Sequence, residues 1–472
     1  MSAFNLAHES ADAENQNPEA GVETPESETA TAAVSEATAA EQEVAQEDDT
    51  AEELDGEQEE LEDIQEEVAK ESDGLSPVTA RLLSQSLSRI VGKQHAKKVF
   101  AMENYQSSRS GQREAKAIAL EGIKETLKQF WEAIKAQLKK FYNKVKTYFV
   151  KAFSAARKLK DRAEKLQTKA NDTIGTIEDK SFSFGQTKAI AVDGKYNDIN
   201  TVTAGLNGVR KWIEANLTVQ KSDKYEGAVE KLQVAVEKAV KDILTDTKSN
   251  GGNSHYNAGF GVSDVKSALS DLGSISIAPY SSVGSPDSKL VEMYAGGKGS
   301  KDKVIISTSL PGGKAMIYVE PDGGSATGLE GVSEVAKAVK NTRIILGNDR
   351  YNPRDVTEGD VKTLTTSQVD KVCDDVIEIA ESAYTYEKAW ERRDKFQAKI
   401  EREIDAIVKD ANSDDDENNA RTGRIIREYA NSFTASIRRR TSFESQFIGY
   451  ALNTGSAFLN YAERSLAQHK SK

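Results

Sequence analysis

Few residues of this chain have types and spacing that could do chemistry. The four histidines, His8, His95, His255 and His469, lie far apart in the sequence and in unlike contexts. We therefore expect no metal-binding or nucleophilic role for them. The scattered serines have no evident His or Lys partner that would activate a hydroxyl group. This pattern favours a protein without catalytic residues.

The remaining chemical motifs are incomplete. The run GGKGS at residues 296–300 lacks the GxxxxGK[ST] spacing of a phosphate loop, and it reads as a turn between two strands. The acidic run at 414–417 lacks the alternation and the glycine of a calcium-binding loop, so it reads as a solvated turn. The one cysteine, Cys373, excludes an internal disulfide and leaves a thiolate-rich zinc site without ligands. We expect no enzymatic activity, no cofactor, no metal and no small-molecule substrate.

The net charge divides the 472-residue chain near residue 103. Residues 1–103 hold 26 Asp and Glu against 6 Lys and Arg, a net charge of −20, whereas the remainder holds 50 acids and 57 bases, a net charge of +7. Such asymmetry indicates an acidic tail or a removable segment. No apolar run approaches the roughly 18 residues that a membrane span needs. The first residues also lack the basic and apolar regions of a secretory signal.

The dominant element that the sequence predicts is a long basic helix over residues 114–170. Apolar residues recur about every 3.5 positions from Leu120 to Leu166, which is the period of one helix face. Lysines fill the other faces. The candidates that we assign to contact with a polyanion are Lys124, Lys128, Lys135, Lys139, Lys140, Lys146 and Lys151.

This helix has three interpretations. It can bury its apolar stripe in a helical bundle, which is the ordinary fate of an amphipathic helix. Its lysine faces can attract phosphates without sequence preference. Its aromatic residues, such as Trp131 and Phe149, stand beside lysines as they do in helices that lie on a membrane surface. The first two interpretations are compatible, whereas the third competes with the first for the apolar stripe.

The acidic N-terminal part is expected to be largely disordered. Residues 1–75 are predicted to be a disordered acidic tail, because residues 1–49 have almost no aromatic side chains and cannot bury enough surface to offset the entropy of ordering. A helix over 50–71 would be marginal because neighbouring like charges oppose it. Residues 76–103 read as helical, with Ser76 as the N-cap, Pro77 at the first helical position and Gly92 as a break. A polar linker and the basic helix then occupy 104–179.

The rest of the chain divides into two further regions. Residues 180–362 are predicted to form a small α+β domain with a short antiparallel meander of strands at 290–295, 303–308 and 315–320, a helix at 332–340 and a strand at 342–346. Residues 363–472 are predicted to form a long helical hairpin, with its second helix interrupted near Gly449 or Gly455. The predicted fold class is α+β, predominantly α.

The tripeptide Ala101-Met102-Glu103 lies where the acidic part ends and the polar linker begins. The whole layout resembles the processed internal head proteins of giant tailed phages of the phiKZ type. The resemblance covers the two ends of the chain, including FWEAIKAQLKKFYNKVKTYF in the basic helix and ALNTGSAFLNYAERSLAQHK near the C-terminus, and leaves residues 180–360 without a counterpart. It implies an acidic propeptide that the prohead protease removes by cutting after a small residue, any residue and Glu. The cut would follow Glu103 and make Asn104 the new N-terminus.

Other tripeptides of this form are present. Those at 7–9, 39–41, 45–47, 51–53 and 69–71 fall in the acidic tail, where we expect them to be accessible trimming sites. Those at 119–121 and 228–230 fall in predicted helices, which a protease reaches poorly.

The resemblance implies a non-enzymatic structural protein of the phage head interior that is synthesised in the host cytoplasm. Its partners would be other head or core proteins, the prohead protease and, weakly and without sequence preference, packaged DNA. Two alternatives stay open. One is a membrane-active or ejected helper that uses residues 114–170, although a membrane partner is not favoured. The other is an adaptor or scaffold with a disordered acidic tail.

Overall fold

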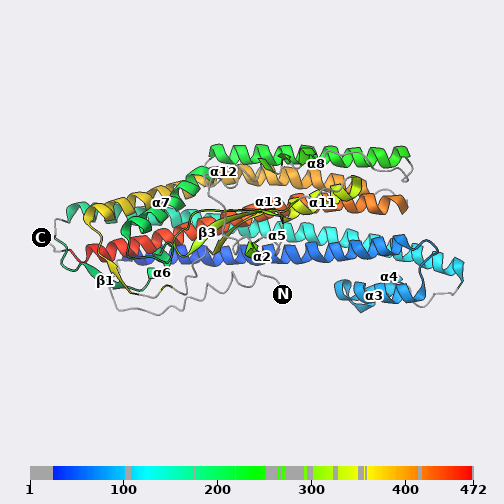
Figure 1. The fold of residues 1–472 in the computed structure, drawn as a ribbon, viewed down its shortest axis with the longest axis horizontal. Coiled ribbons are helices and arrows are strands. Elements are labelled where there is room, and N and C mark those ends of the chain that lie inside the picture. The colour runs from blue at the N-terminus through cyan, green and yellow to red at the C-terminus, as the bar shows by residue number, and fades with distance from the viewer. Residues whose placement is uncertain are drawn as a thin grey trace.

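Long helices run side by side in an elongated bundle, and small antiparallel sheets lie against it (Figure 1). This is a computed structural model, and it describes residues 25–100, 108–173, 176–217, 219–250, 301–322, 328–348, 359–412 and 417–469, with short pieces at 263–265, 267–268, 270–271, 292–294 and 356. The predominantly helical α+β fold class is confirmed.

Three long helices form the centre of the bundle. They are α5 (Arg109–Asp172), α12 (Thr366–Asn412) and α13 (Glu417–Leu466). Helix α5 begins at Ser108, whose side chain accepts a hydrogen bond from the Gly111 amide and so satisfies a free helix-end donor. Its apolar stripe is buried, and Phe149 lies 4.5 Å from Trp390 of α12 between ring centroids. The long basic helix and the C-terminal hairpin are both confirmed.

Helix α13 continues through Gly449 and Gly455, so the expected interruption is wrong. A Cβ atom at position 455 would lie 3.1 Å from Leu159 Cδ2 and 3.4 Å from Val376 Cγ1. The glycine therefore lets α13 approach α5 and α12 closely. Tertiary packing here outweighs the roughly 1 kcal/mol by which glycine disfavours a helix.

The acidic N-terminal part contains a long helix, α2 (Pro25–Lys70), so the expectation of disorder is wrong for these residues. Residues 1–24 lie outside the described part. Helix α2 packs along α5 and α13, and it runs antiparallel to α13 (Figure 1). Its buried face consists mainly of small and branched side chains: Ala30, Ala33, Val34, Ala37, Ala40, Val44, Ala51, Leu61, Ile64 and Val68. Most of these side chains bury little area each, but together they form a continuous face by which α2 packs on the other helices. The local composition did not predict this face.

Two short helices follow and fold back against α2 and the first turns of α5. They are α3 (Pro77–Val91) and α4 (Lys93–Phe100). The predicted cap is confirmed, because the Ser76 hydroxyl accepts a hydrogen bond from the Thr79 amide at 3.1 Å. Gly92 ends α3 with φ of 82°, a conformation that favours glycine. A separate apolar cluster joins this unit to α2 and α5, and it includes Leu61, Ile64, Leu87, Val99, Phe100 and Ile123.

The middle region supplies a three-stranded antiparallel sheet in the order β2 (Lys303–Ile306), β3 (Lys314–Glu320) and β4 (Arg343–Asn348). Helix α11 (Gly328–Asn341) lies between β3 and β4 in the chain. The expected strand at 290–295 is wrong, because residues 292–294 are helical. Residues 292–294 therefore do not form the first strand of the predicted meander. The third strand of the sheet is β4, which follows α11 in the chain.

One face of this sheet joins the main core, and the other face has a small apolar cluster of its own. On β3, Met316 and Tyr318 face the core that α5, α12 and α13 share, whereas Ile317 and Val319 face a small cluster with β2. The helices α6 (Thr187–Ile190) and α7 (Ile199–Asn216) contribute to the main core, and α8 (Val219–Asn250) packs on α12 and α13. The strands β1 (Ser181–Phe184) and β5 (Gly359–Lys362) pair and bring the ends of this region together.

Candidate functional site

The proposed cleavage residues Ala101, Met102, Glu103 and Asn104 lie outside the described residues. The described chain stops at the end of α4 and resumes at Ser108, the N-cap of α5. Cleavage between these helices would therefore separate α2, α3 and α4 from the rest of the chain without cutting a described helix.

The structure changes the interpretation of the other small-x-Glu tripeptides. Those at 39–41, 45–47 and 51–53 lie within α2, and the one at 69–71 begins at its last turn. The expectation that these are accessible is therefore wrong for the folded chain, because a protease needs extended substrate. The tripeptides at 119–121 and 228–230 lie in α5 and α8, as predicted. Residues 7–9 lie outside the described part.

The candidate lysines of α5 do not form one common surface. Lys128, Lys139, Lys140 and Lys146 are exposed, and Lys124 is half-buried. Other lysines are engaged within the chain: Lys135 pairs with Asp405 at 3.0 Å, and Lys151 pairs with Glu36 of α2 at 3.3 Å. Another lysine of this helix, Lys144, pairs with Glu43 of α2 at 2.7 Å. The exposed members remain candidates for contact with a polyanion.

The aromatic stripe of α5 faces the protein interior. Phe141, Phe149 and Phe153 are buried, and the Trp131 indole donates a hydrogen bond to Asp405 at 3.2 Å. Within the part of the chain that the structure describes, no helix is both long and apolar enough to cross a bilayer. Use of α5 at a membrane surface would require this stripe to leave the core.

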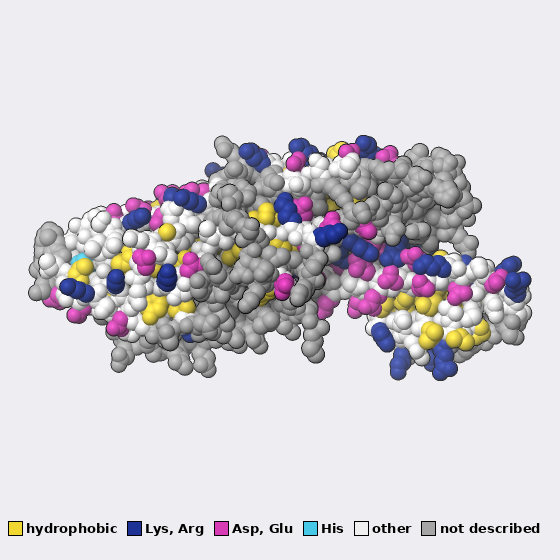
Figure 2. Space-filling view, in the orientation of Figure 1, with side chains coloured by type: hydrophobic (Ala, Val, Ile, Leu, Met, Phe, Trp, Pro, Cys, Tyr) yellow, Lys and Arg dark blue, Asp and Glu magenta, His cyan; other side chains and the backbone are white. Residues whose placement is uncertain are grey.

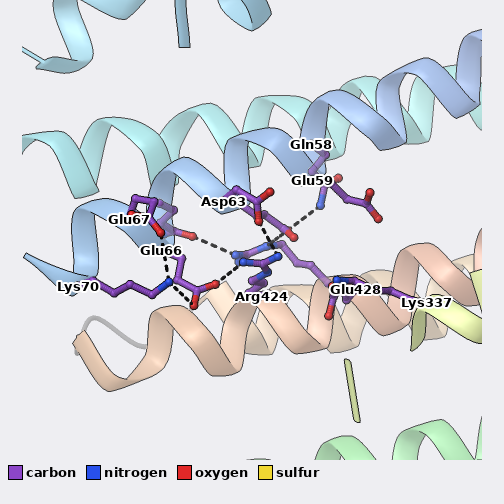
Figure 3. Close-up of polar contacts among 12 residues, drawn as sticks. Gln58, Glu59, Asp63, Glu66, Glu67, Lys70, Lys337, Arg424 and Glu428 are labelled. Carbon is purple, nitrogen blue, oxygen red and sulfur yellow. Dashed lines mark hydrogen bonds and ion pairs between the residues drawn. The ribbon is translucent and has the colours of Figure 1, made fainter. Parts of the chain in front are cut away.

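A second basic surface, which the sequence reasoning missed, lies between α2 and α13. We call Arg424, Arg427, Arg438 and Arg439 of α13 the arginine row. All four guanidinium groups point to α2 and pair with its carboxylates. Figure 3 shows Arg424 rising from α13 between Asp63 and Glu66 of α2.

The opposing carboxylates form a regular series along α2. We call Asp48, Glu52, Asp55, Glu59, Glu62 and Glu66 the acidic row. Arg438 pairs with Asp48 and, at 3.3 Å, with Asp55, and Arg439 pairs with Glu52 at 2.9 Å. Farther along, Glu62 pairs with Arg427 at 2.8 Å, Glu66 pairs with Arg424, and Glu59 pairs with Lys340 of α11 at 2.9 Å. Figure 2 shows acidic side chains gathered beside Lys and Arg on the right-hand half of the body.

Burial makes these pairs interdependent. The Arg438 side chain is 1% exposed, and the Arg427 and Glu62 side chains are 6% and 2% exposed. Burial raises the pKa of Asp48 and of Asp55, and the charge of Arg438 opposes that shift. Burial also works against the Arg438 cation, but the charges of Asp48 and Asp55 outweigh it and leave its pKa raised. Neither side of the pair is stable in this position without the other.

The acidic row could have been found in the sequence. Its members follow one another at intervals of 4, 3, 4, 3 and 4 residues, which places them on one helix face. The arginines gave a weaker signal, because residues 421–440 contain six arginines and one acid but no regular spacing. Only the fold brings the two segments together, since Asp48 and Arg438 are 390 positions apart.

The cysteine and two of the histidines that the sequence offered for chemistry are buried or hydrogen-bonded within the fold. Burial raises the pKa of the Cys373 thiol to about 12. His95 Nε2 lies 3.0 Å from the Thr126 hydroxyl, and His469 Nε2 lies 2.9 Å from the Leu364 carbonyl oxygen. Among the described residues, no group of three or more His, Cys, Asp or Glu side chains is placed to hold a metal ion. The charged interface of α2 and α13 is therefore the candidate functional site.

Comparison with known protein families identifies a match over most of the chain. The model of the family described as phiKZ-like phage internal head proteins matches residues 29–464, which include α2, α5, the sheet and the C-terminal hairpin. No curated protein and no solved structure matches the chain. The chain thus belongs to the phiKZ-like phage internal head proteins, which are structural proteins of the virion head interior.

Proposed function

We propose that this chain is a non-enzymatic precursor whose N-terminal segment is removed by the prohead protease after Glu103. The mature protein would begin at Asn104 and lie against packaged DNA. Loss of residues 1–103 changes the net charge from −13 to +7, so that repulsion from the DNA phosphates becomes weak attraction.

The observation that carries the proposal is the position of the acidic segment on basic residues of its own chain. Helix α2 holds 18 Asp and Glu and one Lys, a net charge of −17. Its carboxylates pair with Lys144 and Lys151 of α5 and with the arginine row of α13. Before cleavage the precursor therefore neutralises its own cations, which would limit contact with nucleic acid during assembly.

The mass and N-terminus of the protein in purified virions test this proposal. Intact-mass measurement and N-terminal sequencing should give a chain that begins at Asn104. In phage carrying Glu103→Gln, the same position should remain uncut. A full-length chain that begins near Met1 in mature virions would reject the proposal.

Two measurements discriminate this proposal from the adaptor or scaffold hypothesis and from the membrane-active helper hypothesis. Absence of the protein from purified virions would favour the adaptor or scaffold hypothesis. A membrane-active helper should co-sediment with anionic liposomes as the intact mature protein. Binding by an isolated peptide of residues 104–170 would not count, because that peptide exposes the apolar stripe that the folded protein buries.

A further inference from the structure

We infer that the arginine row is a binding site for the phosphates of duplex DNA, and that α2 occupies this site as an internal phosphate mimic until it is cut away. This inference rests on the proposed function, because only loss of the leader uncovers the site. It names the surface that meets DNA and places it on α13 rather than on the exposed lysines of α5.

The chemistry of the row suits phosphate. Each guanidinium is a planar donor group that matches the geometry of phosphate or carboxylate oxygens and keeps its charge at any physiological pH. Ion pairs join each of the four arginines of the row to α2. Arg440 behaves differently, because it pairs with Glu444 on its own helix at 2.8 Å. The row therefore consists of arginines of α13 whose ion pairs are made with α2 rather than within α13.

The spacing of the acidic row imitates a polyanion. Its alternating intervals of 4 and 3 residues place one carboxylate about every 5 Å along the helix axis, over a length of about 27 Å. One strand of duplex DNA carries a phosphate about every 3.4 Å along its axis. The arginine row faces the acidic row in the folded chain. A strand of DNA would present negative charges to the same arginines at a similar spacing.

The leader contacts the body through small apolar side chains, the ion pairs of the acidic row and a cluster that it shares with the start of α5. At one end, the face of α2 that packs on the main core is made of Ala33, Val34, Ala37, Ala40 and Val44, which bury little apolar area each. At the other end, α2 shares an apolar cluster with α3, α4 and the first turns of α5, so release of the leader must break the contacts with Ala119, Ile123 and Leu127. Release would remove the α2 carboxylates that pair with the four arginines, while Glu428 of α13 would remain near Arg424. Duplex DNA can supply anions in place of those α2 carboxylates.

Duplex-DNA binding by the cut and uncut protein tests the inference. In the full chain, residues 101–107 are replaced by the recognition sequence of a site-specific protease, and the folded protein is cut and passed over a gel-filtration column. Binding to a fluorescent 30-base-pair duplex of random sequence is measured by anisotropy at several salt concentrations. We expect at least tenfold tighter binding after the cut. Four phosphate contacts should add about 3 to 4 to the log–log salt slope.

Two matched double variants locate the contact. Arg424→Gln with Arg439→Gln removes the two less buried members of the row, each 17% exposed, whereas Lys139→Gln with Lys146→Gln removes two exposed lysines of α5. In the cut protein, the arginine variant should lower the salt slope by about 2 and weaken binding more than the lysine variant does. Circular dichroism checks that both variants fold.

Footprinting of the unmutated chain with phenylglyoxal gives a second measurement that needs no variant. Arg424 and Arg439 should be protected in the uncut chain, reactive after the cut and protected again when DNA is added. A leader that stays bound after cutting and is not displaced by DNA would overturn the inference. So would DNA binding that the lysine variant loses and the arginine variant keeps. In that last case the protein still binds DNA, and virion protein beginning at Asn104 would still support the proposed function.

Discussion

The two halves of the α2–α13 pair are buried by different physical means. In the first half of α2, small apolar side chains such as Ala37 and Val44 join the main core, and Thr38 accepts a hydrogen bond from Asn453 of α13 at 2.8 Å. In the second half, the acidic row meets the arginine row. The same two helices thus combine an apolar contact, which needs only shape, with a charged contact, which needs the right partner. Because the charged contact depends on its partner, the proposed loss of α2 would leave the arginines of α13 able to pair with another anion.

The largest effect should come from breaking the charged half. Arg438→Ala leaves Asp48 and Asp55 buried without their cation, so the free energy of unfolding should fall by about 3–5 kcal/mol. Urea unfolding followed by circular dichroism measures this change. Arg157→Ala is the matched control, because its pair with Glu387 is exposed and should contribute about 1 kcal/mol or less. Equal losses in the two variants would show that the charged half is not special.

A carboxylate in the apolar half should respond to pH. Glu41 lies beside Gly449, and burial raises the pKa of its carboxyl group from 4.5 to about 7. The folded state therefore holds a proton that the unfolded state releases between pH 4.5 and 7, and stability falls as the pH rises through 7. Glu41→Gln should raise the free energy of unfolding by about 3 kcal/mol at pH 8 and change it little at pH 4.5. Thermal unfolding at both pH values, with Glu36→Gln as the exposed control, measures the difference.

Close packing of α13 against its apolar neighbours should tolerate no added volume. Gly455→Val places new methyl groups where a Cβ atom alone lies 3.1 Å from Leu159. We expect unfolding to become easier by about 1–3 kcal/mol. Urea unfolding tests this, and a neutral or stabilising result would mean that α5 and α13 are not tightly packed at this point.

The smallest effect should be a gain at the neighbouring glycine. A Cβ atom at position 449 would lie 3.5 Å from the Tyr148 hydroxyl, which is an ordinary contact distance. Gly449→Ala should therefore stabilise the protein by up to about 1 kcal/mol through its better helix propensity. A shift of the urea midpoint measures the gain. A loss here as large as that of Gly455→Val would show that both glycines are required for close packing.

Local signals in the sequence were sufficient for much of the fold. The apolar period of residues 114–170 identified α5, and Ser76-Pro77 identified the start of α3, because both depend on neighbours within a few positions. The segment 290–295 was misread as a strand, since a short apolar run does not distinguish a strand from a helical turn. Gly455 was misread as a break, since its reason lies on two other helices.

By itself, the sequence determined the charge division near residue 103 and the long helices α5, α12 and α13. Only the tertiary structure decided that Pro25–Lys70 of the acidic part is a helix and that its carboxylates meet the arginines of α13. The physical reason is distance along the chain. A row of like charges opposes helix formation when it stands alone, and it becomes stable only when cations nearly 400 residues away fold onto it.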